Sequence, residues 1–257
     1  MLEPLKRWHL ALAPNASGVA FDVEWIARTE AWNTNRLVFD DGQGGGSDFA
    51  HFFQSGRYRG WLDIDGKRHE VEDWYGQRDR SRGVRQAATR QGMNLWVSGQ
   101  FPEFAVSFAL NLDRNGQQTL LDGAVMPCRG KPDPITEIRH RLEFTDNLEC
   151  RGGELLVRTQ AGDGYLLEVD LSRNRGGHLA GGGYGGWHGT PRGQVIEYEA
   201  WTLDDHVSPR TLEVPITDRL AWFGSRGKRT AQGSGVFEFS HSRSPSYRYA
   251  PTPEKAR

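Results

Sequence analysis

The chain has 257 residues, and its 32 basic and 33 acidic side chains give a formal net charge of −1. Such a balance produces no field that attracts nucleic acid or an anionic membrane, so we expect neither as a partner. Hydrophobic residues are only 37% of the chain, but nine Trp, twelve Phe and seven Tyr supply enough buried area for a core, which argues against disorder. The first residues lack the apolar run of a signal peptide and no later window is apolar enough to span a membrane, so we predict a cytoplasmic protein.

Hydrophobic alternation with a period of two runs through most of the chain and predicts β-strands. Taken in order, the predicted strands are 5–12, 19–25, 48–54, 58–64, 68–71, 95–98, 104–112, 119–125, 136–144, 154–159, 164–171, 194–203 and 235–240. Asp65-Gly66 and Asn115-Gly116 are turn sequences of the kind that tight hairpins prefer. No window keeps helical spacing for three turns. We therefore predict an all-β protein of antiparallel strands.

A proline-rich stretch suggests where the chain divides. Residues 127–134, PCRGKPDP, contain three prolines, which a sheet interior does not tolerate. We place a first β-barrel in residues 1–126 and a second in 127–245. Residues 246–257 form a tail, for which we expect a surface position or disorder.

The stretch 76–85, GQRDRSRGVR, is not explained as core. In an extended strand Gln77, Asp79 and Ser81 point one way, and the arginines at 78, 80 and 82 point the other. A desolvated Asp79 would have a raised pKa and could act as a general acid, whereas a neighbouring arginine would hold it ionised. We expect its carboxylate to be partly buried against an arginine or a backbone N–H. The alternative is an exposed, salt-bridged edge strand.

A second unusual stretch is 176–189, which has eight glycines in fourteen residues. A phosphate site is disfavoured, because a β pattern follows where a phosphate loop needs a helix. One interpretation is a pocket into which Tyr184, Trp187 and His188 reach; the other is a long hairpin connection. Glu197 either faces inward with an arginine or lies on the surface. His51 is in phase with two phenylalanines, which is typical of a buried, hydrogen-bonded histidine.

The stretch 76–85, preceded by GRYRGWLDIDG, resembles the G-x-RDHSWG-x-R signature of the double lipocalin-like superfamily. This superfamily includes AttH-like proteins, carotenoid 1,2-hydratases and fungal Diels–Alder cyclases. GYGGWHG, followed by QVIEYEAWTLD, is similar to the matching stretch of the second barrel. The resemblance runs from about Trp8 to Phe239. It implies two tandem lipocalin-like antiparallel β-barrels and proton-driven or shape-driven chemistry on apolar, terpenoid- or polyketide-like molecules, without a cofactor.

Two departures from the signature limit which properties of the superfamily the resemblance implies for this chain. Arg80 and Arg82 stand where the superfamily has His and Trp. The superfamily also carries more sequence before the motif than the 75 residues present here, so the first barrel is abbreviated, completed by another subunit, or cut away. Completion by another subunit would make the protein a homo-oligomer, which is one of the alternatives.

From these observations we select candidate site residues. The candidate catalytic residues are Asp79 and His188. The candidate substrate-binding residues are Tyr75, Arg78, Ser81, Arg85, Tyr184, Trp187 and Glu197. Histidines and acids do not cluster as a zinc site requires, and the two cysteines lack a metal-ligand spacing, so we expect no metal.

The expected function is a cofactor-independent lyase or hydratase, or an isomerase-cyclase, for an apolar small molecule. The first alternative is a non-catalytic carrier of an apolar or acidic lipid-like ligand, and a more distant one is a β-sandwich carbohydrate binder. An ionisable side chain in a perturbed environment would favour the enzyme.

Overall fold

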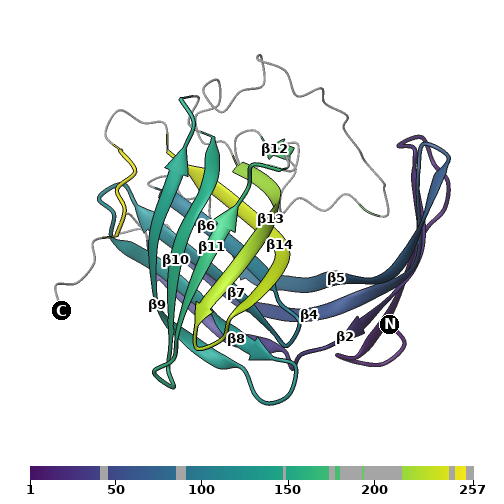
Figure 1. The fold of residues 1–257 in the computed structure, drawn as a ribbon, viewed down its shortest axis with the longest axis horizontal. Helices are drawn as coiled ribbons and strands as arrows, with labels where there is room; N and C mark the ends of the chain where they lie inside the picture. The colour runs from purple at the N-terminus through teal and green to yellow at the C-terminus, as the bar shows by residue number, and fades with distance from the viewer. Residues whose placement is uncertain are drawn as a thin grey trace.

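The computed structural model describes residues 1–40, 46–84, 91–146, 149–173, 177–179, 193, 216–242 and 247–252. Within these ranges every regular element is a β-strand, which confirms the all-β prediction (Figure 1). The described residues accordingly contain no helix of the length and apolarity needed to cross a membrane. The strands are β1 (Arg7–Leu12), β2 (Val19–Ala27), β3 (Trp32–Asp40), β4 (Gly46–Ile64), β5 (Lys67–Val84), β6 (Gln91–Gln100), β7 (Phe104–Asp113), β8 (Gln118–Pro127), β9 (Asp133–Phe144), β10 (Cys150–Thr159), β11 (Gly164–Asp170), β12 (Gly177–Leu179), β13 (Ile216–Gly227) and β14 (Ala231–His241).

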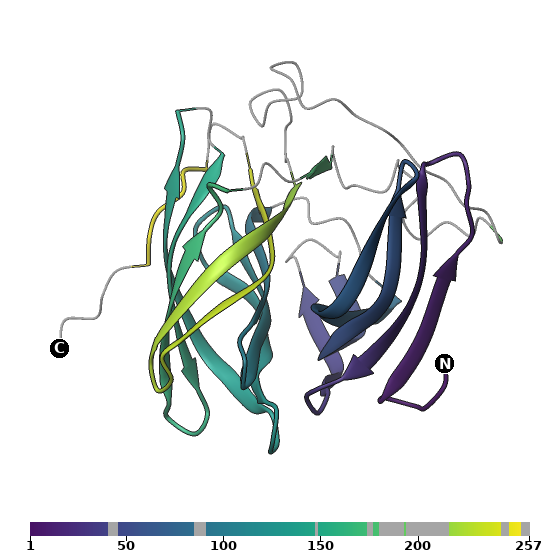
Figure 2. The ribbon, with the colours of Figure 1, turned by 45° about the vertical axis from the view of Figure 1, so that its right-hand side comes forward.

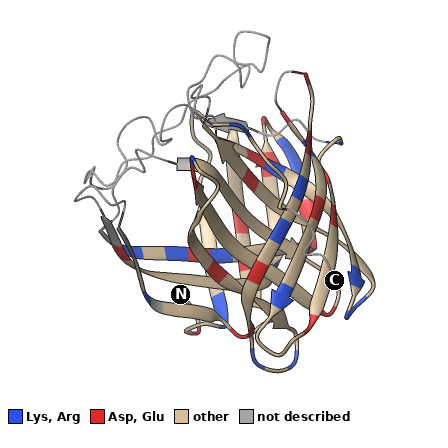
Figure 3. Cartoon of the chain, turned by 90° about the vertical axis from the view of Figure 1, so that its left-hand side faces the viewer, with Lys and Arg blue, Asp and Glu red and all other residues tan. Residues whose placement is uncertain are grey.

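Eight of the described strands form a closed antiparallel barrel. Their order is β11-β10-β9-β8-β7-β6-β14-β13, and pairing of β11 with β13 closes the ring. β12 pairs with the first part of β13, at Ile216 to Asp218. Figure 3 shows basic and acidic residues interspersed over the barrel strands.

Strand alternation fills the interior of this barrel with side chains. Successive inward positions on β6, β7 and β14 are at most 4% exposed, namely Leu95, Val97, Phe108, Leu110, Phe237 and Phe239. They pack with Leu155 and Val157 of β10, across the barrel, and with Phe223 of β13 into one core. Burial of each such side chain is worth about 1.5–3 kcal/mol. The barrel interior at the described positions is therefore a packed core.

The remaining five strands form a second sheet built around a long hairpin of β4 and β5. The hairpin turns at Asp65 and Gly66, whose φ angles of 51° and 80° are those of the predicted tight turn. β2 pairs with the half of β4 nearest this turn and β3 with the other half, while β1 extends the sheet beyond β2. The described strands of this sheet do not close into a ring. Within the described residues, the predicted N-terminal barrel is therefore an open sheet, which is the abbreviated form that the sequence analysis allowed.

The sheet stands beside the barrel and is joined to it by polar side chains (Figure 2). Arg28, in the connection from β2 to β3, donates to the carbonyl oxygens of Phe101 and Phe104 at 2.7 and 2.8 Å. The side chain of Gln100 bonds with Ser55 and donates to the carbonyl of Gly76 at 3.0 Å. Sheet and barrel therefore share buried hydrogen bonds.

The predicted division of the chain at residue 127 does not coincide with the boundary between the two sheets. β6, β7 and β8 precede it but belong to the barrel, and the change of sheet falls between β5 and β6, at residues 85–90. Residues 127–134 join two neighbouring strands of the barrel, in which Ala124 pairs with Pro134. The prolines are tolerated because β8 and β9 pair at only two positions there, so few backbone N–H groups are required.

The prediction for the tail is also wrong for residues 247–252. Tyr247 is 4% exposed and belongs to the barrel core. The hydroxyl of Tyr249 accepts the backbone N–H of Leu142 at 2.7 Å, and the N–H of Thr252 donates to the carbonyl of His140 at 3.0 Å. Buried rings and backbone hydrogen bonds thus fix this segment against β9.

Candidate active site between the sheet and the barrel

A row of side chains crosses five neighbouring strands on the outer face of the barrel. Directly paired residues point to the same side of a sheet, so the row follows from the register. It runs through Asp218, Glu238, Trp96, Ala109 and Asp122, on β13, β14, β6, β7 and β8 in that order. The flanking Phe237 and Phe239 point into the barrel core, so the row faces outward. Three carboxyl groups therefore share one row outside the barrel.

At one end of the row a buried histidine-carboxylate pair joins the barrel to the sheet. His51 of β4 lies with Nδ1 3.0 Å from Oδ2 of Asp122, and both residues are buried. The other oxygen, Oδ1, accepts from Nε1 of Trp32 at 2.9 Å and from the hydroxyl of Thr34 at 2.5 Å. Burial alone would raise the pKa of Asp122, but the hydrogen bonds from His51, Thr34 and Trp32 outweigh it and lower that pKa. Asp122 is thus an ionised, fully bonded anchor for the imidazole.

Asp79 lies on the other side of this imidazole. It pairs with Phe53 across the β4–β5 hairpin, two residues from His51, and therefore projects from the same face of the sheet. Its Oδ2 is 4.0 Å from Nε2 of His51, and its side chain is 48% exposed. Asp79 is therefore among the exposed residues, and the neighbour on this face is a histidine where the sequence predicted an arginine or a backbone N–H. His51 therefore links a buried carboxylate to one that solvent reaches.

Next to Asp218, which ends the row on the other side, Glu238 has an unusual environment. Burial first, and then the charge of Asp218, raise its pKa to about 7, and the carboxylate of Asp79 contributes in the same direction. Nδ2 of Asn94 donates to its Oε1 at 2.8 Å, which opposes the shift. Burial also raises the pKa of Asp218. Near neutral pH, Glu238 is therefore a mixture of carboxylic acid and carboxylate.

This arrangement is suited to proton transfer. A carboxylic acid with a pKa near the working pH is an efficient donor, and groups whose pKa values are pushed apart take opposite roles. Glu238 and Asp122 are two such carboxyls on one row, with raised and lowered pKa values. Across the part of the chain that the structure describes, no set of three or more His, Cys, Asp or Glu side chains is arranged to hold a metal ion.

The other predicted residues of the hairpin lie apart from this cluster or on its edge. Residues 76–84 are extended, as predicted, and Ser81 pairs with His51 and so shares the face of Asp79. Arg78 pairs with Gln54 and projects from the opposite face. Tyr75 is held between two guanidinium groups, 3.9 Å from that of Arg57 and 4.9 Å from that of Arg28. This stacking gives Tyr75 a structural contact beside the Arg28 connection to the barrel.

Five predicted residues lie outside the described residues, namely Arg85, Tyr184, Trp187, His188 and Glu197. They stay candidates on sequence grounds alone.

Four residues of the cluster were missed or undervalued by the sequence analysis, namely His51, Asp122, Asp218 and Glu238. A weak signal was present, because Glu238 alternates with Phe237 and Phe239 in a strand whose polar face has few other charges. His51 was predicted as a buried, bonded histidine, and it is one, but its partner is 71 residues away in the sequence. Strand alternation gives the face of each residue and says nothing about which strands meet.

Comparison with solved structures places the fold in a known class. The chain is similar to a kievitone hydratase from Nectria haematococca, with 16% identity and a TM-score of 0.54 over 91% of this chain and 65% of that one. It is also similar to a candidate AttH protein from Nitrosomonas europaea, with 11% identity and a TM-score of 0.52 over 93% of this chain and 66% of the other. At these identities the likeness shows a shared fold, and the two similar proteins agree with the all-β architecture that the sequence predicted. The chain spans about two thirds of the length of these two structures.

The particular family is defined by sequence. Residues 1–183 match the model of the domain of unknown function DUF7064, and the chain belongs to that family. None of the curated proteins matches this chain.

Proposed function

We propose that the chain is a cofactor-independent enzyme of the hydratase/lyase or isomerase/cyclase type. Its substrate would be an apolar, terpenoid- or polyketide-like small molecule bound between the sheet and the barrel. The proposal is carried by Glu238, whose pKa is raised to about 7 by burial and by Asp218 and Asp79, on the same row as the His51–Asp122 pair. Perturbed carboxyls of this kind gather at catalytic centres more often than at structural ones. The likeness in fold to a kievitone hydratase agrees with this reaction class.

The proposed chemistry needs only these side chains and water. Protonated Glu238 gives its proton to one carbon of a carbon–carbon double bond, whose electron pair forms the new C–H bond. The neighbouring carbon, now cationic, accepts the oxygen of a water molecule, and the water loses a proton to Asp79. Asp79 is half-exposed and returns that proton to solvent, while Glu238 is reprotonated. Isomerisation or cyclisation uses the same first step and ends with loss of a proton from carbon.

The other residues of the cluster have positioning roles in this scheme. Asp122 holds the His51 ring, and the ring keeps Nε2 directed toward Asp79. Asn94 fixes the carboxyl of Glu238 through its amide. Trp96, between Glu238 and Ala109 in the row, offers an apolar surface against which a hydrocarbon can pack.

The proposal is tested by incubating the protein with a panel of terpenoid and polyketide-like alkenes in ¹⁸O-labelled water. Mass spectrometry then detects products that contain labelled oxygen or that are rearranged isomers. Glu238→Gln keeps the shape and the Asn94 contact but cannot give up a proton, so we expect turnover to fall by about 10²–10⁴-fold. Glu154→Gln, which removes an exposed carboxylate paired with Arg141 on the far strands β9 and β10, should leave turnover unchanged.

The outcomes separate the enzyme from the carrier alternative. Equal turnover in wild type and Glu238→Gln would refute the role of Glu238. Tight binding of a panel member without any turnover, in wild type as in Glu238→Gln, would favour a carrier.

A further inference from the structure

A cavity of about 720 Å³ opens on the face of the β4–β5 hairpin that points away from the barrel. Arg78, Arg80, Phe52 and Gln54 line it, and alternation places them opposite Asp79 and His51. The apolar part of the lining is Leu5, Ala27, Ala31 and Phe52. Its charged part is Lys6, Arg28, Arg78, Arg80 and Glu30. The proton-transfer cluster and this cavity thus lie on opposite sides of the same two strands.

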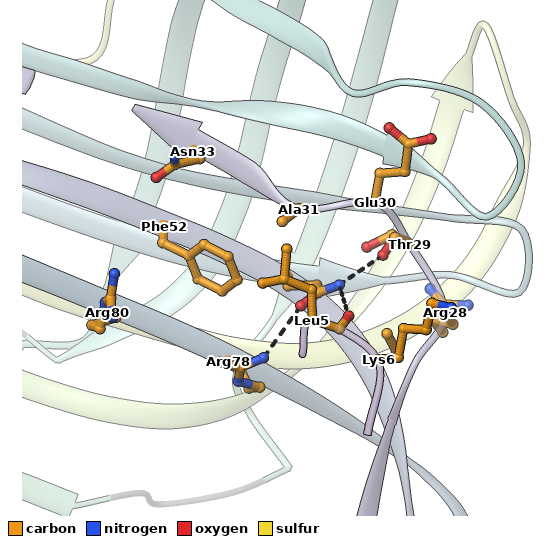
Figure 4. A pocket seen from close by; sticks show the side chains of 12 residues that line it. Leu5, Lys6, Arg28, Thr29, Glu30, Ala31, Asn33, Phe52, Arg78 and Arg80 are labelled. Carbon is orange, nitrogen blue, oxygen red and sulfur yellow. Dashed lines mark hydrogen bonds between the residues drawn. The ribbon is translucent and has the colours of Figure 1, made fainter. Parts of the chain in front are cut away.

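The Arg78 guanidinium lies close to the ring of Phe52, which lines the cavity, and to that of Trp8. Its guanidinium carbon lies 4.2 Å from the ring centre of Trp8 and 5.3 Å from that of Phe52. Its Nη1 donates to Oε1 of Gln54 at 3.4 Å, and Gln54 is itself fixed by the carbonyls of Leu5 and Thr29 (Figure 4). The guanidinium is therefore pre-oriented with donors to spare, since a guanidinium carries five N–H groups.

Arg80 is a second guanidinium on the same wall. It follows Arg78 by two residues, and it pairs with Phe52, which pairs in turn with Asn33 of β3. Within the described parts of the chain, Arg80 makes no ion pair or hydrogen bond. Burial, and then the charge of Arg80, lower the pKa of Arg78. Two like charges beside each other, one of them partly desolvated, are relieved by an anion that binds both.

We infer that this cavity binds an organic carboxylate with an apolar body, its carboxylate on Arg78 and Arg80 and its body against Phe52, Leu5 and Ala31. Arginine matches a planar carboxylate with two parallel hydrogen bonds, which a lysine does not do. The volume lies within the range of about 300–1,000 Å³ that is usual for small-molecule sites. Glu30, at the other end of the lining in Figure 4, disfavours a second anionic group there. This site is separate from the proposed active site and does not depend on it.

The test is isothermal titration calorimetry with decanoate as the probe, at low and high salt. Neutral 1-decanol and cationic decyltrimethylammonium have the same alkyl body. We expect decanoate to bind with an affinity that falls as salt is added, and the other two probes to bind at least tenfold more weakly. Arg80→Gln should weaken decanoate about tenfold and Arg80→Glu should abolish binding, whereas Arg82→Gln should stay within twofold of wild type. Arg82 is the matched control, because it is the next residue on the same face of β5 and does not line the cavity.

We expect the Arg80 variants to fold as the wild type does, because Arg80 is exposed and makes no described hydrogen bond. The melting temperatures of the three variants should match that of the wild type. Equal affinity for decanoate and decanol, absence of decanoate binding, or unchanged binding in Arg80→Glu would each overturn the inference. Glu238→Gln should bind decanoate as the wild type does, which distinguishes this cavity from the proton-transfer cluster.

Discussion

At the scale of single residues, the buried carboxylate of Asp122 is the most extensively hydrogen-bonded carboxyl group of the site. It receives hydrogen bonds from Trp32, Thr34 and His51, three donors from the sheet on one barrel residue. A buried carboxylate is costly unless its oxygens are bonded in this way. The three contacts therefore orient the imidazole and hold sheet and barrel together at the same point.

Asp122→Asn should change the tautomer of His51 and lower stability. The amide oxygen would keep the bonds from Trp32 and Thr34, leaving its NH₂ group to donate to Nδ1 of His51. The neutral ring would then carry its proton on Nε2, whereas the wild type carries it on Nδ1. We expect the free energy of unfolding to fall by about 1–3 kcal/mol for the lost charged hydrogen bond. Nitrogen-15 NMR of the neutral imidazole and urea unfolding measure the two effects, and an unchanged tautomer would contradict the assigned bond.

Glu238→Gln should stabilise the protein above neutral pH. The pKa of Glu238 is raised in the folded chain from its usual 4.5 to about 7, so the unfolded chain binds fewer protons between these values. Stability then falls as pH rises through this window and levels off above it. Removing the carboxyl should recover on the order of 3 kcal/mol at pH 8 and almost nothing at pH 4, since one pKa unit corresponds to about 1.4 kcal/mol.

Thermal unfolding of the wild type and Glu238→Gln across this pH range measures the difference. Asp218 and Asp79 are the acidic groups that face Glu238, so Glu168→Gln on β11 serves as a distant control. A stability gain that was the same at pH 4 and pH 8 would argue against a raised pKa.

At the scale of elements, the connection between β2 and β3 joins the sheet to the barrel through Arg28. This guanidinium is partly buried and lies over Tyr75, and it donates to the carbonyls of Phe101 and Pro102, between β6 and β7, and of Phe104 at the start of β7. Hydrogen bonds from a charged donor contribute about 1.5–3 kcal/mol each. Arg28 thus ties the sheet to the barrel from the β2–β3 connection, which belongs to neither sheet.

Arg28→Gln should therefore be strongly destabilising. We expect a loss of about 2–4 kcal/mol in urea unfolding, with faster amide exchange at the ends of β2 and β7. Arg36→Gln is the control, because Arg36 and Asp48 form an exposed pair whose attraction is largely screened by solvent. A loss no larger for Arg28 than for Arg36 would show that the connection is not important for the association of sheet and barrel.

The local sequence pattern predicted the presence of most strands better than it predicted where each strand begins and ends. Strands at 19–25 and 104–112 and the Asp65-Gly66 turn follow from alternation and turn chemistry and are confirmed. β4 was predicted as two strands, 48–54 and 58–64, because Ser55, Gly56 and Arg57 interrupt its apolar pattern, and Gly60 lies within the second of them. Both glycines are required by close packing, since a Cβ at Gly56 would meet the Trp25 ring at 2.3 Å and one at Gly60 the Asp22 carbonyl at 2.1 Å. β3 and β13 were missed, because their alternation is broken by polar residues on the face that meets another part of the chain.

At the scale of the whole molecule, the candidate site is assembled from strands far apart in the sequence. Its titratable groups and their partners come from β3, β4, β5, β6, β8, β13 and β14. Of these groups, the motif at 76–85 pointed to Asp79, and the resemblance it carried led to the correct fold. The others could not be predicted, since their proximity depends on how the open sheet lies against the barrel.

The central claim is that Glu238 holds a proton near neutral pH because Asp218, Asp79 and burial oppose its ionisation. Carbon-13 NMR of the side-chain carboxyl of Glu238, titrated from pH 3 to pH 9, tests it directly, with Glu238→Gln to assign the signal. We predict a midpoint near 7 that moves to lower pH in Asp79→Asn and further in Asp218→Asn. A midpoint near the usual 4.5 in the folded wild type, unmoved by either substitution, would contradict the account.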